Sequence, residues 1–470
     1  MKQYLCILTC SLSLCALTSH GQITLDSTVV SEEVIATNLD VPWEILWGPD
    51  DLIWFTERDD GRVGRVDPET GIRDTLLVIS DVYHTSESGL LGMALHPDFT
   101  NPDSAFVYLV YTYYNGSSIR ERLVRYRYQN NALINPAILI DNIPGNGNHN
   151  GSRLMFGPDG KLYMTTGDAQ NTSNPQNQNT VAGKILRINT DGSIPSDNPD
   201  NGSYVWTFGH RNPQGLVWAS NGILYSSEHG PNNDDEINII SVGENYGWPD
   251  VEGYCNSSPE ITFCNNNNVV EPIRAWTPTI ALAGLDYYDH EAIPEWQNSL
   301  LLVTLKSDDF RVFKLNAAGD TILSEVIHLN DDYGRLRDLC ISPSGDIYIS
   351  TSNRDGRANN GFPISADDRI IKLYNANYSP TGIPTGTHRA SSYNLFPNPS
   401  TGRLNIRTNG ATNREHTIEI MDSVGHVVKE SSWTGQQGYM DVSTLPPGAY
   451  LYVITAEDGR RDAGRFVLVK

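Results

Sequence analysis

The stretch Phe-Gly-Pro-Asp-Gly-Lys-Leu-Tyr-Met-Thr at residues 156–165 indicates the fold class, because a Gly-Pro-Asp-Gly turn runs directly into an alternating apolar strand. Copies of this phrase return at 47–56, 219–227 and 341–350, and looser copies lie at 95–111 and 293–304. They form about six units spaced by roughly 50–70 residues, at or above the periods of propeller repeats. An all-β fold is expected, a six-bladed β-propeller with four short strands per blade around an axial channel. A single β-sandwich is the alternative, but it needs no such repetition.

The composition of the chain fits many short strands joined by tight turns. Its 470 residues include 40 Gly and 26 Pro, and 39% are hydrophobic and 19% charged, which excludes disorder throughout. The formal net charge of −23 argues against binding to nucleic acid, because DNA and RNA are polyanions. An anionic ligand would need a local basic pocket. Helices are expected to be few and short, because no long stretch has helical periodicity.

The first residues have the pattern of a signal peptide. Lys2 precedes an apolar stretch at 4–17, and Ser-His-Gly at 19–21 supplies small residues where a signal peptidase cuts. Residues 1–21 are expected to be removed by cleavage before Gln22. A membrane anchor is the alternative, but the apolar stretch is too short to span a bilayer, and no later stretch is long enough. The mature chain is therefore expected to be exported.

Cysteine usage agrees with export to an oxidising compartment. Three of the six cysteines lie within the signal segment. Cys255 and Cys264 stand in one loop, where a local disulfide is favoured over free thiols. Cys340 is expected to be a buried strand residue. Because no Cys-x-x-Cys pair exists, a thiolate zinc site is not expected.

The composition of the sequence changes after Leu373. Residues 22–375 are expected to form the propeller, and residues 376–392, which are rich in Ser, Thr, Pro and Gly, a linker. A second unit at 393–470 has short strands broken by Gly and Pro turns, as in a small antiparallel β-sandwich.

This second unit resembles the C-terminal sorting domain of type IX secretion cargo. The resemblance rests on Phe-Pro-Asn-Pro-Ser-Thr-Gly at 396–402, Asp-Ser-Val-Gly at 422–425 and Leu-Pro-Pro-Gly-Ala-Tyr-Leu-Tyr at 445–452. It implies the type IX secretion machinery as a partner, passage through the periplasm and across an outer membrane, and then release or surface attachment. A carbohydrate-binding module is the alternative for this unit.

Two segments place polar side chains where the strands and loops of a propeller meet the axis. His149 lies between glycines that let a ligand approach closely, in Asn-Gly-Asn-His-Asn-Gly-Ser-Arg-Leu at 146–154; a structural or merely exposed histidine is the alternative. Arg211, in Phe-Gly-His-Arg-Asn-Pro-Gln-Gly-Leu at 208–216, either pairs with a neighbouring blade or directs its guanidinium at an anionic oxygen.

A third segment has the hard oxygen ligands that Ca²⁺ prefers. Gly230 and Pro231 leave their carbonyl oxygens uncovered, and the carboxylates of Asp234, Asp235 and Glu236 follow. The spacing is not that of an EF-hand loop, and a solvated acidic turn is the alternative.

A fourth set is cationic. Lys306 ends one strand, and Arg335 and Arg337, two residues apart, point to the same face at the start of another. In so acidic a chain these cations would form a local anion trap. The alternative is ordinary surface pairing with Asp308, Asp309 or Asp338.

Together these segments resemble the soluble sugar dehydrogenases that depend on pyrroloquinoline quinone (PQQ), the glucose/sorbosone dehydrogenase group, from about residue 41 to residue 373. The resemblance rests on several phrases in a fixed order. They are Gly-Leu-Leu-Gly-Met-Ala-Leu-His-Pro-Asp-Phe at 89–99, the His149 segment, Gly-His-Arg-Asn-Pro-Gln-Gly at 209–215, His-Gly-Pro at 229–231 with Asp-Asp-Glu-Ile-Asn at 234–238, Asn-Tyr-Gly-Trp-Pro at 245–249, and Arg-Leu-Arg-Asp at 335–338.

The resemblance implies a role for each matched residue. His149 would be the general base that takes the proton of the anomeric hydroxyl while hydride passes to the quinone, and Arg211 would stabilise the charge that develops on the quinone oxygen. The cofactor-binding residues would be Asn212, His229, Lys306, Arg335 and Arg337, with Trp276 and Thr279 at the rim. Gly230 and Pro231 would bind the calcium that also ligates PQQ, and Glu236 with the Tyr246 carbonyl a second, structural calcium.

The sugar-binding positions depart from the pattern of glucose-oxidising members. Glu87 and Asn148 stand where those members tend to carry a glutamine and an aspartate, and His229 replaces a glutamine. The resemblance therefore implies an aldose substrate oxidised to a lactone, with an external electron acceptor, rather than glucose in particular. A non-catalytic propeller that binds a glycan or protein at the cell surface is the alternative.

Overall fold

The computed structural model describes residues 21–359, 361–378, 393–396, 400, 402–408, 414–422, 426–456 and 461–468. The predicted signal peptide lies outside these residues except for Gly21, and so does most of the predicted linker. Strands dominate the part of the chain that is described, and its only helices are α1 (Ser258–Asn267) and the short 3-10 turn η1 (Pro294–Trp296). The helix α1 has no buried residue and is tied to the loop before it by the predicted disulfide between Cys255 and Cys264, which is confirmed.

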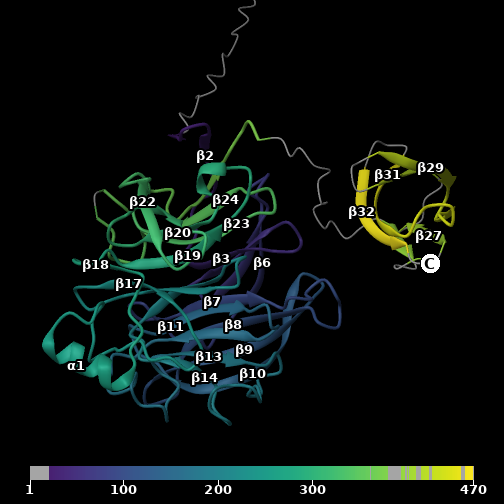
Figure 1. Ribbon diagram of the computed structural model, residues 1–470. Coiled ribbons are helices and arrows are strands. Elements are labelled where there is room, and N and C mark those ends of the chain that lie inside the picture. The colour runs from purple at the N-terminus through teal and green to yellow at the C-terminus, as the bar shows by residue number, and fades with distance from the viewer. Residues whose placement is uncertain are drawn as a thin grey trace, which may run out of the picture.

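Six antiparallel sheets follow one another along the chain as the blades of a propeller (Figure 1). Blade one has β3 (Pro42–Trp47), β4 (Ile53–Glu57), β5 (Arg62–Val66) and β6 (Arg73–Val78). Blade two has β7 (Leu90–Leu95), β8 (Phe106–Tyr114), β9 (Ile119–Gln129) and β10 (Ala132–Pro144). Blade three has β11 (Gly151–Phe156), β12 (Leu162–Thr166), β13 (Lys184–Ile188) and β14 (Val205–Phe208).

The last three blades complete the ring. Blade four has β15 (Pro213–Trp218), β16 (Leu224–Glu228), β17 (Asp235–Ile239) and β18 (Arg274–Trp276), and blade five has β19 (Leu282–Tyr288), β20 (Ser299–Thr304), β21 (Phe310–Leu315) and β22 (Ile322–His328). Blade six has β23 (Leu336–Ile341), β24 (Ile347–Thr351) and β25 (Ile370–Tyr374), to which the N-terminal β2 (Val29–Ala36) and then β1 (Gln22–Thr24) are added. Pairing of β2 with β25 closes the ring, and the six-bladed prediction is confirmed.

The core is divided among the blades. Apolar clusters lie between each pair of neighbouring blades, such as that of Trp54 and Val63 with Leu90 and Val107 between blades one and two. Cys340 is buried in one of these clusters, as predicted. Burying apolar side chains against both neighbours fixes each blade in the ring.

The first strand of every blade contacts the first strands of its neighbours, in the order β3, β7, β11, β15, β19, β23 and back to β3. Because first and second strands are antiparallel, the starts of the first strands and the ends of the second strands meet at one end of the channel. In all six blades the pairing register shifts near this end. Such bulges re-aim side chains, here those of Arg153, Gln214 and Arg337.

The C-terminal part forms sheets of its own (Figure 1). One sheet has β26 (Tyr393–Phe396), β27 (Arg403–Thr408) and β30 (Gln437–Asp441), and the other has β28 (Glu415–Met421), β29 (Val427–Thr434), β31 (Gly448–Ala456) and β32 (Arg461–Leu468). Buried residues from both sheets, among them Leu404, Ile418 and Phe466, form one apolar cluster. The predicted small antiparallel sandwich is confirmed, while the predicted boundaries of the domains stay a prediction.

Candidate functional site

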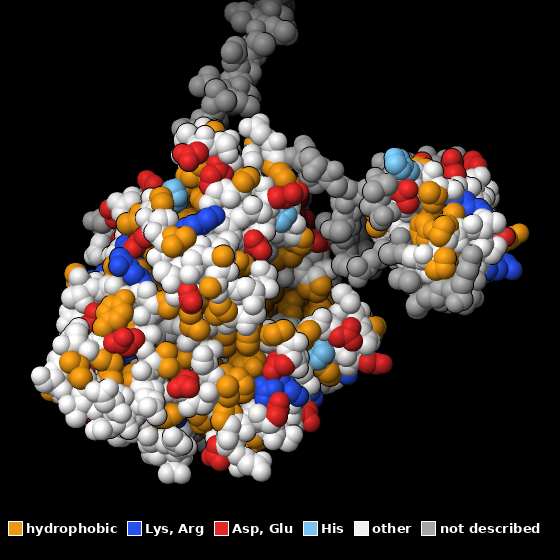
Figure 2. Space-filling view, in the orientation of Figure 1, with side chains coloured by type: hydrophobic (Ala, Val, Ile, Leu, Met, Phe, Trp, Pro, Cys, Tyr) orange, Lys and Arg blue, Asp and Glu red, His pale blue; other side chains and the backbone are white. Residues whose placement is uncertain are grey.

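A cavity of about 260 Å³ opens where the strand ends meet. Acidic side chains are spread over the face of the propeller seen in Figure 2, as the net charge of −23 requires. The cavity has the opposite character, because five cations line it against two carboxylates, Glu87 and Asp355. The cations are Arg58, Lys306, Arg335, Arg337 and Arg357. Positive charge is therefore concentrated in the cavity.

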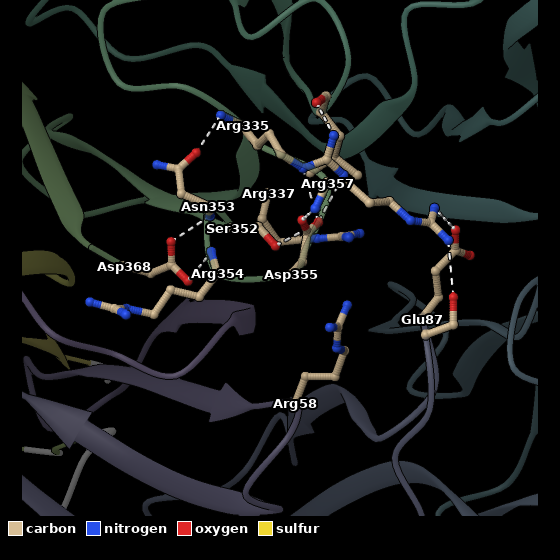
Figure 3. A network of polar contacts seen from close by, with 12 residues as sticks. Arg58, Glu87, Arg335, Arg337, Ser352, Asn353, Arg354, Asp355, Arg357 and Asp368 are labelled. Carbon is tan, nitrogen blue, oxygen red and sulfur yellow. Dashed lines mark hydrogen bonds and ion pairs between the residues drawn. The ribbon is translucent and has the colours of Figure 1, made fainter. Parts of the chain in front are cut away.

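Arg335 is held rigidly at the wall of the cavity (Figure 3). Its Nε and Nη2 donate to Oδ2 of Asp355 at 2.9 and 2.8 Å, and its Nη1 donates to the carbonyl oxygen of Leu305. The surface-pairing alternative is not seen for Arg335, because its carboxylate partner is the buried side chain of Asp355.

Arg337 lies deeper, at the bulge of β23. Its Nη1 donates to Oε1 of Gln214 at 2.7 Å, and its Nε is buried without a partner. Burial, together with the nearby charge of Arg58, lowers the pKa of Arg337 to about 9. A bound anion would stabilise both this charge and the free donor.

A buried ion cluster joins the first strands of blades one, three and six. Arg153 Nη1 donates to Glu44 at 2.5 Å and to Asp338 at 3.0 Å, and the guanidinium lies 4.5 Å from the ring centre of Trp43. Burial, only partly offset by Arg153, raises the pKa of Glu44 to about 8. The cluster supports Gln214, whose backbone oxygen accepts from Arg153 Nε at 2.8 Å.

His149 forms a dyad with a carboxylate that the sequence did not single out. Nδ1 of His149 lies 2.9 Å from Oδ1 of Asp168, which is 1% exposed. Asp168 also accepts from the backbone of Gln170 at 2.7 Å and from the indole of Trp248 at 2.9 Å. With Nδ1 donating to Asp168, Nε2 of His149 is left as a proton acceptor.

Arg211 and Asn212 stand beside this dyad. The carbonyl oxygen of Arg211 accepts from the backbone of Asp168 at 2.8 Å, and its Nη1 donates to the carbonyl oxygen of His229 at 3.1 Å. Oδ1 of Asn212 accepts from the backbone of Gly151 at 3.0 Å. The Nε of Arg211 and the Nδ2 of Asn212 are buried without partners, so both donors are available to a ligand.

Glu87 and Asn148, the predicted sugar-binding pair, are joined by Arg357. Arg357 Nη1 donates to Oε1 of Glu87 at 2.5 Å, and Nη2 donates to Oδ1 of Asn148 at 3.2 Å. Burial would raise the pKa of Glu87, but the charges near it, first that of Arg357, outweigh burial and hold the pKa below its usual range. Glu87 is therefore an ionised acceptor.

Among the other predicted cofactor residues, His229 and Lys306 line the cavity and Trp276 does not. His229 lines the cavity, with its Nε2 against the carbonyl oxygen of Leu282, and burial lowers its pKa. Lys306 also lines the cavity, and its Nζ donates to Oγ1 of Thr279 at 3.0 Å. Trp276 is not brought there: it is 8% exposed in the apolar cluster between blades four and five, and its indole donates to Glu325 at 3.3 Å.

The predicted calcium ligands lie in blade four and the loops that flank it. The structure gives no hydrogen bond to the carbonyl oxygens of Gly230 and Pro231 from any residue that it describes. Glu236 is the register partner of Glu228, so two carboxylates face each other, and burial with the charge of Glu228 raises the pKa of Glu236 to about 8. A cation here would relieve that repulsion. Tyr246 stacks on His210, with ring centres 4.6 Å apart.

Among the residues that the structure describes, no group of three or more His, Cys, Asp or Glu side chains is arranged to hold a metal ion. The calcium site predicted at Gly230 and Pro231 would instead be built from backbone carbonyl oxygens. No helix in the described part of the chain is long and apolar enough to cross a bilayer.

Sequence patterns did not indicate four residues of this site: Arg58, Asp168, Asp355 and Arg357. A positional signal was available, because Arg58 directly follows β4 and Asp168 follows β12 by two residues, just as His229 directly follows β16. The polar segment Asn-Arg-Asp-Gly-Arg at 353–357 likewise follows β24. Polar residues after the second strand of each blade are therefore candidates for the channel mouth.

Comparison with known proteins agrees with this geometry. The family model described as glucose/sorbosone dehydrogenase matches residues 39–360, and that of a secretion system C-terminal sorting domain matches residues 394–468. Quinoprotein glucose dehydrogenase B of Acinetobacter calcoaceticus is 34% identical over 409 residues, with 68% of this chain and 85% of the relative covered. An aldose sugar dehydrogenase of Escherichia coli K12 is 30% identical over 344 residues, with 70% of this chain and 91% of the relative covered.

Solved structures give the same result. The PQQ-bound form of aldose sugar dehydrogenase from Streptomyces coelicolor is similar with a TM-score of 0.64 and 32% identity, covering 73% of this chain and 98% of that one. The apo-form of the soluble aldose sugar dehydrogenase from Escherichia coli has a TM-score of 0.64 and 28% identity, covering 74% and 99%. The chain therefore belongs to the glucose/sorbosone dehydrogenase family, a family of sugar oxidoreductases, and it ends in a secretion sorting domain.

Proposed function

We propose that this protein is an exported dehydrogenase that depends on PQQ and calcium and oxidises the anomeric carbon of aldose sugars to lactones. The observation that carries the proposal is the cavity, where five cations gather in a chain of net charge −23. A small polycarboxylate is the ligand that such a site would attract. A quinoprotein relative and a PQQ-bound structural neighbour support PQQ as that ligand.

The residues present fit PQQ, a planar tricarboxylate. Lys306, Arg335 and Arg337 would hold its carboxylates through charge-assisted hydrogen bonds. Buried donors without partners, the Nε of Arg211, the Nδ2 of Asn212 and the Nε of Arg337, would gain acceptors. When bound, PQQ supplies the two-electron acceptor of the reaction.

His149 would act as the general base. Asp168 accepts a hydrogen bond from Nδ1–H of His149, which leaves Nε2 free to take the proton of an anomeric hydroxyl. As the ring becomes charged, the buried carboxylate of Asp168 stabilises it. Arg211, linked to Asp168 through its backbone, would place a positive charge beside the same reaction centre.

Calcium would be held by oxygen atoms of blade four and its loops. The carbonyl oxygens of Gly230 and Pro231 would serve one ion, and Glu236 with the Tyr246 carbonyl a second. The buried pair of Glu228 and Glu236 supports the second site, because two facing carboxylates call for a cation. The sorting domain supports export by the type IX machinery, through the periplasm to the cell surface or medium, where an external acceptor would receive the electrons.

Reconstitution tests this proposal. Purified protein is mixed with PQQ and CaCl₂, freed of unbound PQQ by gel filtration, and assayed with a panel of aldoses and an artificial electron acceptor. The expected result is a quinone absorbance that travels with the protein and aldose-dependent reduction of the acceptor, both lost in EDTA. Binding of a glycan without retention of PQQ would instead identify a non-catalytic binder.

A further inference from the structure

A single guanidinium joins three loops at the mouth of the cavity. Arg357 lies in the connection from β24 to β25, and it reaches the connection from β6 to β7 and that from β10 to β11. Figure 3 shows its side chain extended toward Glu87. Nη2 of Arg357 donates to Oγ of Ser86 at 3.0 Å and to Oδ1 of Asn148 at 3.2 Å, in addition to the contact of Nη1 with Glu87.

The same bridge is tied to the cationic wall of the cavity. Asp355 accepts from Arg335 through Oδ2, and through Oδ1 it accepts from the backbone of Arg357 at 2.9 Å. One buried carboxylate thus fixes both the position of Arg335 and the turn that carries Arg357 (Figure 3). Asp355 thus links the backbone of Arg357 to the side chain of Arg335.

Glu87 has one oxygen to spare. Its Oε1 is occupied by Arg357, whereas Oε2 is buried without a partner in the structure. An ionised carboxylate oxygen without a donor is costly, and a hydroxyl from a ligand in the cavity would satisfy it. Because Arg357 binds Oε1, Oε2 is the oxygen of Glu87 that remains for a ligand.

We propose that Arg357 is a positioning residue for the substrate: it fixes Glu87 and Asn148 so that the free oxygen of Glu87 receives a hydroxyl of a neutral aldose. This inference rests on the proposed function. A sugar acid is disfavoured, because its carboxylate would meet the negative charge of Glu87, and both terminal nitrogens of Arg357 are already engaged.

The test compares three variants that are reconstituted with PQQ and calcium. Arg357→Ala removes the bridge and Arg357→Lys keeps the charge. Arg354→Ala is the matched control on the same loop, because, among the residues that the structure describes, the side chain of Arg354 donates hydrogen bonds to the carbonyl oxygens of Ser365 and Asp367 and not to Glu87 or Asn148. For each variant KM and kcat are measured with D-glucose, D-galactose, D-xylose and D-glucuronate, and PQQ affinity is measured separately by titration.

We expect Arg357→Ala to raise KM for neutral aldoses about tenfold, since a charge-assisted contact at a half-exposed site is lost. The change in kcat should be about threefold or less, PQQ affinity should stay within about twofold, and Arg357→Lys should recover part of the KM. An unchanged KM for every neutral aldose, or a change in KM confined to D-glucuronate, would contradict this role of Arg357. Either result would leave the proposed function in place. A parent protein that retains no PQQ and oxidises no aldose would overturn the proposed function and this inference with it.

Discussion

Replacing Asp168 by Asn tests the dyad at its least accessible member. The side chain keeps its size but loses its charge, and Asp168 is 1% exposed, so solvent cannot compensate. The two carboxylate oxygens accept three N–H donors, those of His149, Gln170 and Trp248. An amide offers only one oxygen, so at least one of these donors must face an NH₂ group.

The expected fall in kcat depends on which of the three donors loses its acceptor. If the amide oxygen faces Trp248, the NH₂ group meets His149, whose Nδ1 must then accept, and the ring proton moves to Nε2. That nitrogen can no longer take a proton, so the general-base contribution is lost and kcat should fall about 10²- to 10⁴-fold. KM and PQQ retention should change little, because Asp168 does not line the cavity.

Steady-state kinetics of Asp168→Asn, His149→Gln and the double variant provide the measurement. The double variant should be no slower than the slower single variant, because both changes remove the same base. Asp200→Asn, at an exposed position, is the matched control. An Asp168→Asn enzyme within about threefold of the parental kcat, or single effects that multiply in the double variant, would refute the dyad.

Three further predictions follow from the structure. Arg337→Met should weaken PQQ binding by roughly 10- to 150-fold, because a buried charge is lost, whereas Lys306→Ala, at an exposed position, should have a smaller effect; equal effects in a PQQ titration would contradict this difference. The metal-free protein is stabilised by protonation of Glu236, a contribution that is full below pH 4.5 and lost as the pH rises to about 8. Calcium should therefore raise Tm more at pH 8 than at pH 5, and Glu236→Gln should abolish that difference in calorimetry. Removal of residues 393–470 should leave a folded propeller with unchanged Tm that no longer reaches the cell surface, because the C-terminal sheets have their own core; surface display of the truncated protein would count against the sorting role.

The propeller could be predicted because its signal is local and repeated. Each copy of the turn phrase, such as that at 156–165, begins or joins the first two strands of a blade, and the remaining strands follow from the spacing. Closure of the ring by β2 lies outside this signal, because the strand comes before the first phrase and pairs with β25, more than 300 residues later.

The site could be predicted only in part. His229, Lys306, Arg335 and Arg337 line the cavity, because the ends of first and second strands converge there. Partners from separate connections could not be predicted: nothing near His149 in the chain indicates that Asp168, in the connection from β12 to β13, approaches it. Trp276 lies away from the lining of the cavity, because an aromatic residue on the outer strand β18 gains more by packing between blades than by lining a polar cavity.

A single-turnover experiment tests whether an aldose reduces bound PQQ with His149 as the base. The protein loaded with PQQ and calcium is mixed without oxygen or other acceptor with an aldose that carries hydrogen or deuterium at its anomeric carbon, and the absorbance of the bound quinone is followed. We expect the aldose to reduce the quinone, more slowly when C1 carries deuterium, and His149→Gln to slow the step while retaining PQQ. A bound quinone whose spectrum no aldose changes would contradict it.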